Sequence, residues 1–240
     1  MMTTTTPTRE SVPTIPSTST TSTETTGARF AAAAGVAFVV LTLASTFAAG
    51  SPPASDASAA KIATYFHDHS GGIRAQLLLG GLGIAALLWW FGTLWRLLSR
   101  AENERPRLAV VAAVGLATGL GLALLNGVVI GTAAIRTIDP ATTRLFYSFS
   151  VVAISAAGFG LGTFLLATSV VTYRNRVTPV WVSCLGFVAG LAFFAGTIGS
   201  VTDAHGVVAL GLGAFFVWCV WLLAVSATMW RSATDAKTRP

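Results

Sequence analysis

Long apolar runs separated by short polar segments dominate the pattern of this chain. Six of these runs are long enough to cross a bilayer as helices, because the hydrocarbon core is about 30 Å thick and a helix rises about 1.5 Å per residue. None of them alternates between apolar and polar positions as the strands of a membrane barrel do. The pattern therefore predicts an all-α, polytopic membrane protein, a bundle of six transmembrane helices at residues 30–49, 76–98, 108–135, 145–173, 179–201 and 207–230.

The polar ends of the chain frame this transmembrane domain, which we place at residues 29–230. Residues 1–28 are rich in Thr, Ser and Pro and contain few apolar residues, so we expect a disordered cytoplasmic tail there. Residues 231–240 form a second cytoplasmic tail. The first apolar run has about twenty residues, more than the usual apolar region of a signal peptide, so we expect a retained span rather than a cleaved leader.

The long outer loop between the first two spans predicts a short amphipathic helix. Ser58 is a candidate helix cap, and Ala59, Ile62, Ala63 and Phe66 follow at helical spacing, with Gly71 and Gly72 as the stop. Two interpretations fit this pattern equally well. The helix lies on the outer membrane surface, or it caps the outer mouth of the bundle by packing on the ends of the other helices.

The same loop carries a resemblance to known sequences. It contains two prolines, an Asp-Ala-Ser triplet and a tyrosine followed by histidines, and it leads to a second span that ends Leu87-Leu88-Trp89-Trp90-Phe91-Gly92. In this it resembles a family of uncharacterised actinobacterial multi-span membrane proteins of unknown function. The resemblance covers about a third of the chain, chiefly its first two spans. It implies the six-helix architecture and adds no activity, cofactor or substrate.

Basic residues then predict the orientation, because Lys and Arg of short loops are retained on the cytoplasmic side. If the amino terminus is cytoplasmic, the inner segments hold eleven of the fifteen basic residues, and the outer loops hold only Lys61, Arg74, Arg136 and Arg144. We therefore expect a multi-pass protein of a bacterial plasma membrane with both termini in the cytoplasm. The net charge of +6 forms no continuous basic face, so the lipid bilayer and its anionic lipids are the expected partners rather than nucleic acid.

Inside the spans, the residue types exclude several kinds of chemistry. No Asp, Glu, Lys, Arg or His lies in the middle of any span, whereas ion-coupled transporters and intramembrane proteases keep such groups there. No span offers a histidine to a buried haem. We therefore expect no enzyme activity and no cofactor.

Histidines on the outer side offer a speculative metal site. His67, His69 and His205, together with Asp203, have the ligand types that zinc prefers. Two residues that are two apart on a helix diverge by about 200°, so His67 and His69 do not readily share a metal unless the helix ends between them. Solvated or helix-capping histidines are the favoured interpretation.

Deep aromatic residues offer a speculative ligand pocket. Trp89, Trp90, Trp218 and Trp221 lie away from the interfacial belt and suit a flat apolar molecule or a lipid tail, although core packing is the more economical interpretation. Asn126 lies about two thirds of the way through the third span. Its amide needs a partner inside the membrane, and we favour an interhelical hydrogen bond over a ligand contact.

Four pairs of glycines lie four residues apart in the spans, at 115 and 119, 127 and 131, 158 and 162, and 186 and 190. They predict close helix packing and offer faces for a homo-oligomer. The leading hypothesis is a non-catalytic binding, sensing or scaffolding membrane protein, with a lipid-like ligand as one option. The alternative is a facilitator or transporter subunit for a neutral or apolar solute, with a route past Asn126. A metal-dependent enzyme built on the outer histidines is the least supported.

Overall fold

The computed structural model describes residues 19–54, 56–103, 106–136, 138–201 and 205–238. These residues form helices and no strand, and six of the helices are long and apolar enough to cross a membrane. The predicted all-α, six-span architecture is therefore confirmed. The helices are α1 (Ser19–Ala48), α2 (Ala59–Asp68), α3 (Ser70–Ala101), α4 (Arg107–Ile135), α5 (Pro140–Arg174), α6 (Val180–Val201) and α7 (His205–Thr238).

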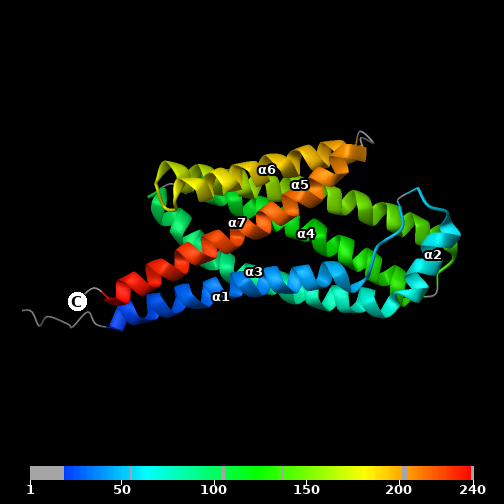
Figure 1. Cartoon of the computed structure of the whole chain (residues 1–240), viewed down its shortest axis with the longest axis horizontal. Helices are drawn as coiled ribbons and strands as arrows, with labels where there is room; N and C mark the ends of the chain where they lie inside the picture. The colour runs from blue at the N-terminus through cyan, green and yellow to red at the C-terminus, as the bar shows by residue number, and fades with distance from the viewer. Residues whose placement is uncertain (1–18, 55, 104–105, 137, 202–204, 239–240) are drawn as a thin grey trace, which may run out of the picture.

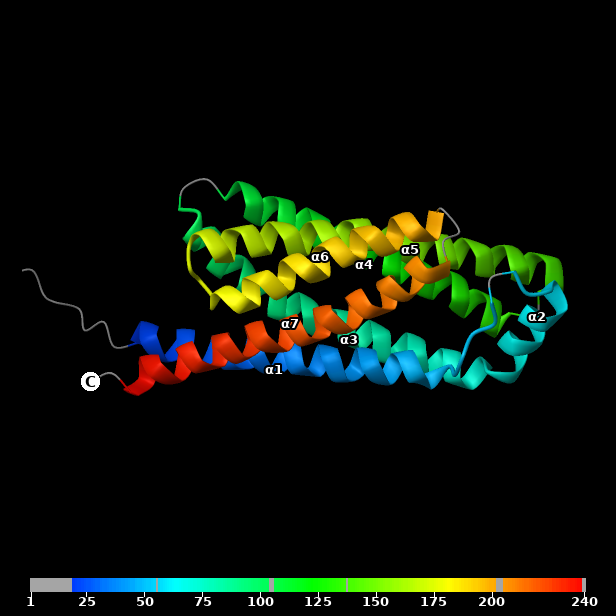
Figure 2. The same ribbon diagram turned by 45° about the horizontal axis from the view of Figure 1, so that its top comes forward.

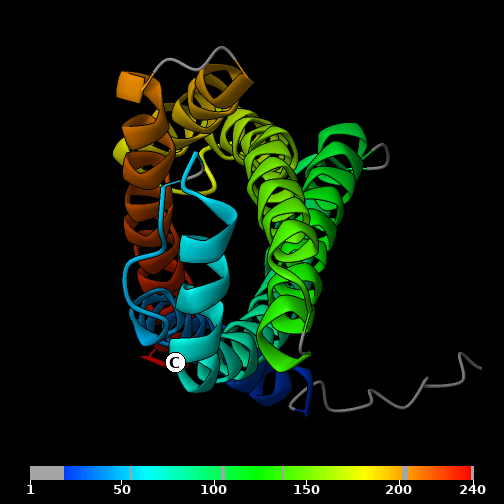
Figure 3. The same cartoon turned by 90° about the vertical axis from the view of Figure 1, so that its right-hand side faces the viewer.

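The six long helices form a ring. α1 packs against α3 and α7, and the remaining neighbours follow chain order from α3 through α7. All six run along the long axis of the molecule (Figures 1 and 2), and the view down that axis in Figure 3 shows α2 crossing one end of the ring. The described ends of the chain lie together at the opposite end, beside the α3–α4 and α5–α6 turns.

Helix α2 caps the bundle, as the second of the two interpretations of this loop proposed. Ser58 caps its first turn by accepting a hydrogen bond from the Lys61 N–H. The two side chains Ile62 and Phe66 are buried in a cluster with residues of α3, α4 and α5. The Tyr65 hydroxyl donates a hydrogen bond to the Ala49 carbonyl at 2.9 Å, which ties α2 to the end of α1.

The junction between α2 and α3 differs from the prediction. The two glycines at 71 and 72 do not stop α2, which ends at Asp68, and both lie in the first turn of α3. A Cβ on Gly72 would collide with the carbonyl oxygen of Ala48 and lie 3.2 Å from the Ala49 Cα. Gly72 therefore serves a close approach between α3 and the end of α1, and this contact offsets the cost of about 1 kcal/mol that glycine carries in a helix.

Both tails are partly helical. α1 begins at Ser19 and α7 continues to Thr238, so residues 19–28 of the predicted amino-terminal tail, and most of the carboxyl-terminal one, extend the first and last spans. Residues 1–18 lie outside the described part of the chain. Just inside these extensions α1 meets α7, where the Arg29 guanidinium lies 5.6 Å from the centre of the Trp230 ring.

Helix α5 begins at a strong cap. The Asp139 carboxylate accepts hydrogen bonds from the N–H groups of Ala141 and Thr142, and Pro140 occupies the first helical position. The hydrogen bonds from Thr142, with a smaller contribution from the Ala141 N–H, hold the pKa of Asp139 below its ordinary value of 3.8. The turn between α4 and α5 is thus stabilised by an ionised carboxylate.

The four predicted pairs of glycines lie at contacts between helices of the same chain. On α4, Gly115 and Gly119 face the backbone of α5, where a Cβ on Gly115 would lie 2.9 Å from the Gly160 carbonyl oxygen. The pair at 127 and 131 faces Leu77 of α3, and the pairs at 158 and 162 and at 186 and 190 lie where α5 meets α6. Close helix packing is confirmed. Because these faces are used within one chain, a second copy would have to bind elsewhere.

Candidate functional site

The five residues of the predicted ligand pocket do not share one site. Trp90, Trp218 and Trp221 are buried in the core, whereas Trp89 is 70% exposed and meets Phe30 edge to face on the outside of the bundle. The two adjacent tryptophans of α3 point to different sides because neighbouring residues of a helix are about 100° apart. Trp89 therefore faces the surroundings of the helix bundle rather than its interior.

Trp90 and Trp221 form an aromatic plug with Phe164 in the centre of the ring. The Trp90 and Trp221 ring centres are 6.1 Å apart, the Phe164 and Trp221 centres are 5.8 Å apart, and both pairs meet edge to face. The Trp90 Nε1–H donates a hydrogen bond to the Ser226 Oγ at 2.9 Å, so this polar group is satisfied. Each of the three rings exposes 1% or less of its surface, so no water-sized space adjoins the plug.

Two glycines make room for the plug. A Cβ on Gly35 of α1 would lie 2.7 Å from Trp90 Cδ1, and a Cβ on Gly186 of α6 would lie 2.6 Å from Trp221 Nε1. Both distances are shorter than real side-chain contacts, so each indole rests directly on the backbone of a neighbouring helix. The plug thereby joins α1, α3, α5, α6 and α7 into one packed layer.

Asn126 lies on a different side of the ring. It belongs to α4, which packs on α3 and α5, whereas Trp218 and Trp221 belong to α7, which packs on α1 and α6. Its side chain is half-buried, and no hydrogen bond joins it to another described residue. The expected interhelical hydrogen bond is therefore not formed within the described chain. Its neighbour Gly127 faces Leu77 of α3, so close packing of the backbone rather than the amide holds α3 and α4 together here.

The predicted metal ligands are only partly described. His67 is exposed on α2, and His69 follows the helix, with its ring stacked on Tyr65 at 4.6 Å and its Nδ1 3.1 Å from the Tyr65 carbonyl oxygen. Asp203 and the side chain of His205 lie outside the described residues. No group of three metal-ligating side chains occurs in the described part of the chain. The structure thus gives His69 a role in the α2–α3 junction.

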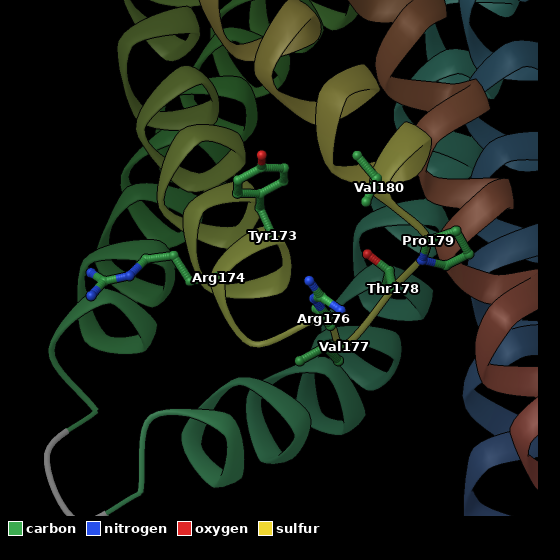
Figure 4. Close-up of a pocket in the computed structure, with 7 residues that line it drawn as sticks. All are labelled: Tyr173, Arg174, Arg176, Val177, Thr178, Pro179 and Val180. Atoms are coloured by element: carbon green, nitrogen blue, oxygen red, sulfur yellow. The ribbon is translucent and has the colours of Figure 1, made fainter.

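A pocket of about 760 Å³ lies at the α5–α6 turn, at the end of the bundle opposite α2. Residues 173, 174 and 176–180 line it (Figure 4). Figure 4 shows Arg176 on the turn with Val177 and Thr178, below the Tyr173 ring in this view, whereas the Arg174 guanidinium points away from them. The pocket therefore combines the Arg176 cation with hydroxyl groups and the start of α6.

Hydrogen bonds make the backbone of this turn rigid. The Arg176 N–H donates to the Tyr173 carbonyl at 3.4 Å and the Val177 N–H donates to the Thr172 carbonyl at 3.1 Å, the pair of bonds that ends many helices. The buried Ser183 hydroxyl lies 3.0 Å from Thr172 Oγ1 and 3.2 Å from Thr178 Oγ1, which joins the end of α5 to the start of α6.

Arg176 occupies a backbone conformation that favours glycine. Its φ is +51°, and the other described residues with positive φ are Gly50 at +71° and Asn103 at +58°, each a residue type that tolerates this region. An arginine there costs about 1–2 kcal/mol relative to a right-handed conformation. From the sequence alone, Arg174 and Arg176 are only indicators of topology. The sequence Arg-Val-Thr-Pro after a long span is the signal for this turn, but it does not indicate that Arg176 has a positive φ.

These features define a polytopic α-helical membrane protein with a packed aromatic centre and a cationic pocket at one end. Comparison with protein-family models, with curated proteins and with solved structures finds no match to this chain. The resemblance to actinobacterial multi-span proteins stays a prediction.

Proposed function

We propose that this chain is a non-catalytic binding or scaffolding protein of the plasma membrane, with both termini in the cytoplasm, rather than a channel or transporter. The aromatic plug formed by Trp90, Trp221 and Phe164 carries the proposal. A neutral solute that crossed the bundle would need a continuous polar route. The plug instead fills the centre of the helix ring with aromatic side chains that expose almost no surface.

The distribution of charge supports the orientation. The end of the bundle that holds the described chain termini also carries Arg29, Arg96, Arg100, Arg107, Arg174, Arg176 and Arg231, and the opposite end carries Lys61, Arg74, Arg136 and Arg144. The basic end belongs in the cytoplasm by the rule that governs short loops. The exposed aromatic side chains Tyr173, Trp181 and Trp230 near this end suit an interfacial belt.

The same plug argues against a lipid-like ligand at the centre of the bundle. Trp90 and Trp221 contact each other, Phe164 and two helix backbones, and a ligand beside them would have to displace these contacts. We therefore propose that binding takes place on the surface of the bundle. The α2 cap at one end and the α5–α6 turn at the other are the surfaces with defined polar groups.

A flux measurement tests the proposal. Purified protein in liposomes is expected to leave the permeability to glycerol and urea at the level of protein-free liposomes. The variants Trp221→Ala, which shortens the plug, and Leu88→Ala, which removes a side chain that is 54% exposed on α3, form a matched pair. The proposal would be overturned in favour of a facilitator if the wild type takes up solute, and if the rate of uptake changes in Trp221→Ala but not in Leu88→Ala.

A further inference from the structure

We propose that the pocket at the α5–α6 turn binds the phosphate of an anionic lipid headgroup, with Arg176 as the principal contact. The first N–H groups of α6 complete the site. The ligand is a phospholipid of the cytoplasmic leaflet. The inference rests on the proposed membrane placement and does not depend on whether the protein transports a solute.

The pocket has the size and the groups for a headgroup. Its volume of about 760 Å³ lies within the usual range of about 300–1,000 Å³ for small-molecule sites. A guanidinium offers several N–H donors in a planar fork that matches phosphate oxygens. The Thr178 hydroxyl is engaged with the Ser183 Oγ at 3.2 Å, so the donors left for a phosphate are the Arg176 guanidinium and the first N–H groups of α6 (Figure 4).

The charge at this site is not neutralised within the described chain. No ion pair joins Arg174 or Arg176 to a described carboxylate, and both side chains are exposed. α6 begins at Val180, and the first N–H groups of a helix have no intrahelical partner and carry a partial positive charge. An anion at the turn therefore interacts with the Arg176 guanidinium and a helix amino terminus.

The backbone conformation of Arg176 points to a use for its side chain. Of the three described residues with positive φ, this is the one at which the chain holds neither glycine nor asparagine. The paired hydrogen bonds of the turn form with the backbone alone, so glycine would make them equally well and without strain. Strained residues concentrate where the side chain has a task, and Arg176 is one of the residues that line the pocket.

The level of the pocket in the membrane favours a lipid over free phosphate. Tyr173, which lines the pocket, is 52% exposed, and Trp181, just after it, is 60% exposed. Exposed tyrosine and tryptophan at the ends of spans lie at the depth of the headgroups. A site at this depth faces the phosphates of the inner leaflet, and an anionic lipid presents its phosphate there at high local concentration.

Lipid retention measured by native mass spectrometry of the detergent-solubilised full chain tests the site. Phosphatidylglycerol, phosphatidylcholine and inorganic phosphate are added in separate arms. The wild type is expected to retain phosphatidylglycerol, and Arg176→Gln to lower its affinity about tenfold or more, because charge-assisted hydrogen bonds are lost. Arg136→Gln, an exposed arginine at the opposite end, is the matched charge control and is expected to change the affinity less than twofold.

Arg176→Gly separates a binding role from a structural one. Glycine relieves the strained φ, so the thermal unfolding midpoint is expected to hold or rise while phosphatidylglycerol retention falls as in Arg176→Gln. Arg176→Lys keeps the charge and is expected to retain more lipid than Arg176→Gln. Equal losses in Arg176→Gln and Arg136→Gln, or unchanged retention in Arg176→Gln, would overturn the site. Saturation by inorganic phosphate with no preference for phosphatidylglycerol would overturn its assignment to a lipid. Each of these results leaves the flux measurement unaffected.

Discussion

Gly160 of α5 is the residue whose substitution tests the packing of the ring most severely. A Cβ added there would meet the Gly119 N of α4, and it would lie 2.7 Å from the Gly115 carbonyl oxygen and 2.8 Å from the Gly119 Cα. All three atoms belong to the α4 backbone, so no side chain can rotate away. Comfortable contacts need about 3.5 Å, so Gly160→Ala must force the two helices apart by up to about 1 Å.

The expected free-energy change follows from two opposing effects. Overpacking of a close contact costs about 1–3 kcal/mol, and alanine in place of glycine inside a helix returns about 1 kcal/mol. We therefore expect Gly160→Ala to lower the free energy of unfolding by up to about 2 kcal/mol, which corresponds to a midpoint up to about 8 °C lower in a chain of this size. The assay is thermal unfolding of the purified protein in detergent, and the observable is the fraction of protein that stays monodisperse at each temperature.

Gly121→Ala on α4 is the control. Nothing lies within 4 Å of a Cβ at Gly121, so this variant gains the helix preference of alanine without a clash. Its midpoint is expected to equal or exceed that of the wild type. Equal midpoints for Gly160→Ala and Gly121→Ala would refute the backbone contact between α4 and α5 on which the ring depends.

Three further predictions concern polar contacts. Ser226→Ala leaves the buried Trp90 Nε1–H without its partner and is expected to lower the free energy of unfolding by about 1–3 kcal/mol in chemical denaturation. Tyr147→Phe removes the hydroxyl that donates to the Pro53 carbonyl, so the loop between α1 and α2 is expected to exchange its amide hydrogens faster while those of the central helices are unchanged. Asp139→Ala is expected to lower the unfolding midpoint near neutral pH. Because the pKa of Asp139 is lowered from 3.8, its stabilising effect is complete above that pH and is lost as the pH falls through the folded-state pKa, so the difference between the variant and the wild type is expected to vanish in acid.

The spans could be predicted from the sequence because length and continuous apolarity are enough to identify a membrane helix. The side of each span that faces the interior could not be predicted in this way. These helices are apolar all round, so periodicity does not separate a lipid-facing side chain from a buried one, as the neighbours Trp89 and Trp90 demonstrate with exposures of 70% and 0%. Lipid and protein interior make the same demand on a side chain, and only the order of helices in the ring distinguishes them.

The short helix α2 was the opposite case. Its Ile62 and Phe66 stand out against polar neighbours, so the buried face was visible in the sequence, and the structure adds only what covers it. The glycines that follow were misread as a stop, because a glycine that ends a helix and a glycine that allows two helices to touch look alike in a sequence. Gly72 is of the second kind.

The candidate sites depended on contacts between distant segments and were correspondingly harder to predict. Asn126 was expected to bond across helices, but no described residue bonds to its side chain. Arg176 was counted only as a topological charge, because the positive φ that sets it apart arises from the hydrogen bonds of the turn. Sequence order gives no access to either fact.

Membrane placement with the basic end in the cytoplasm is the central claim, and cysteine labelling of intact cells tests it most directly. Cys184 and Cys219 are first replaced, and a single cysteine is then introduced as Lys61→Cys on α2 or as Val177→Cys at the α5–α6 turn. Intact cells that carry each variant are treated with a membrane-impermeant maleimide. We predict labelling at position 61 in intact cells and at position 177 only after the membrane is permeabilised. Labelling at position 177 in intact cells, with position 61 protected, would contradict it.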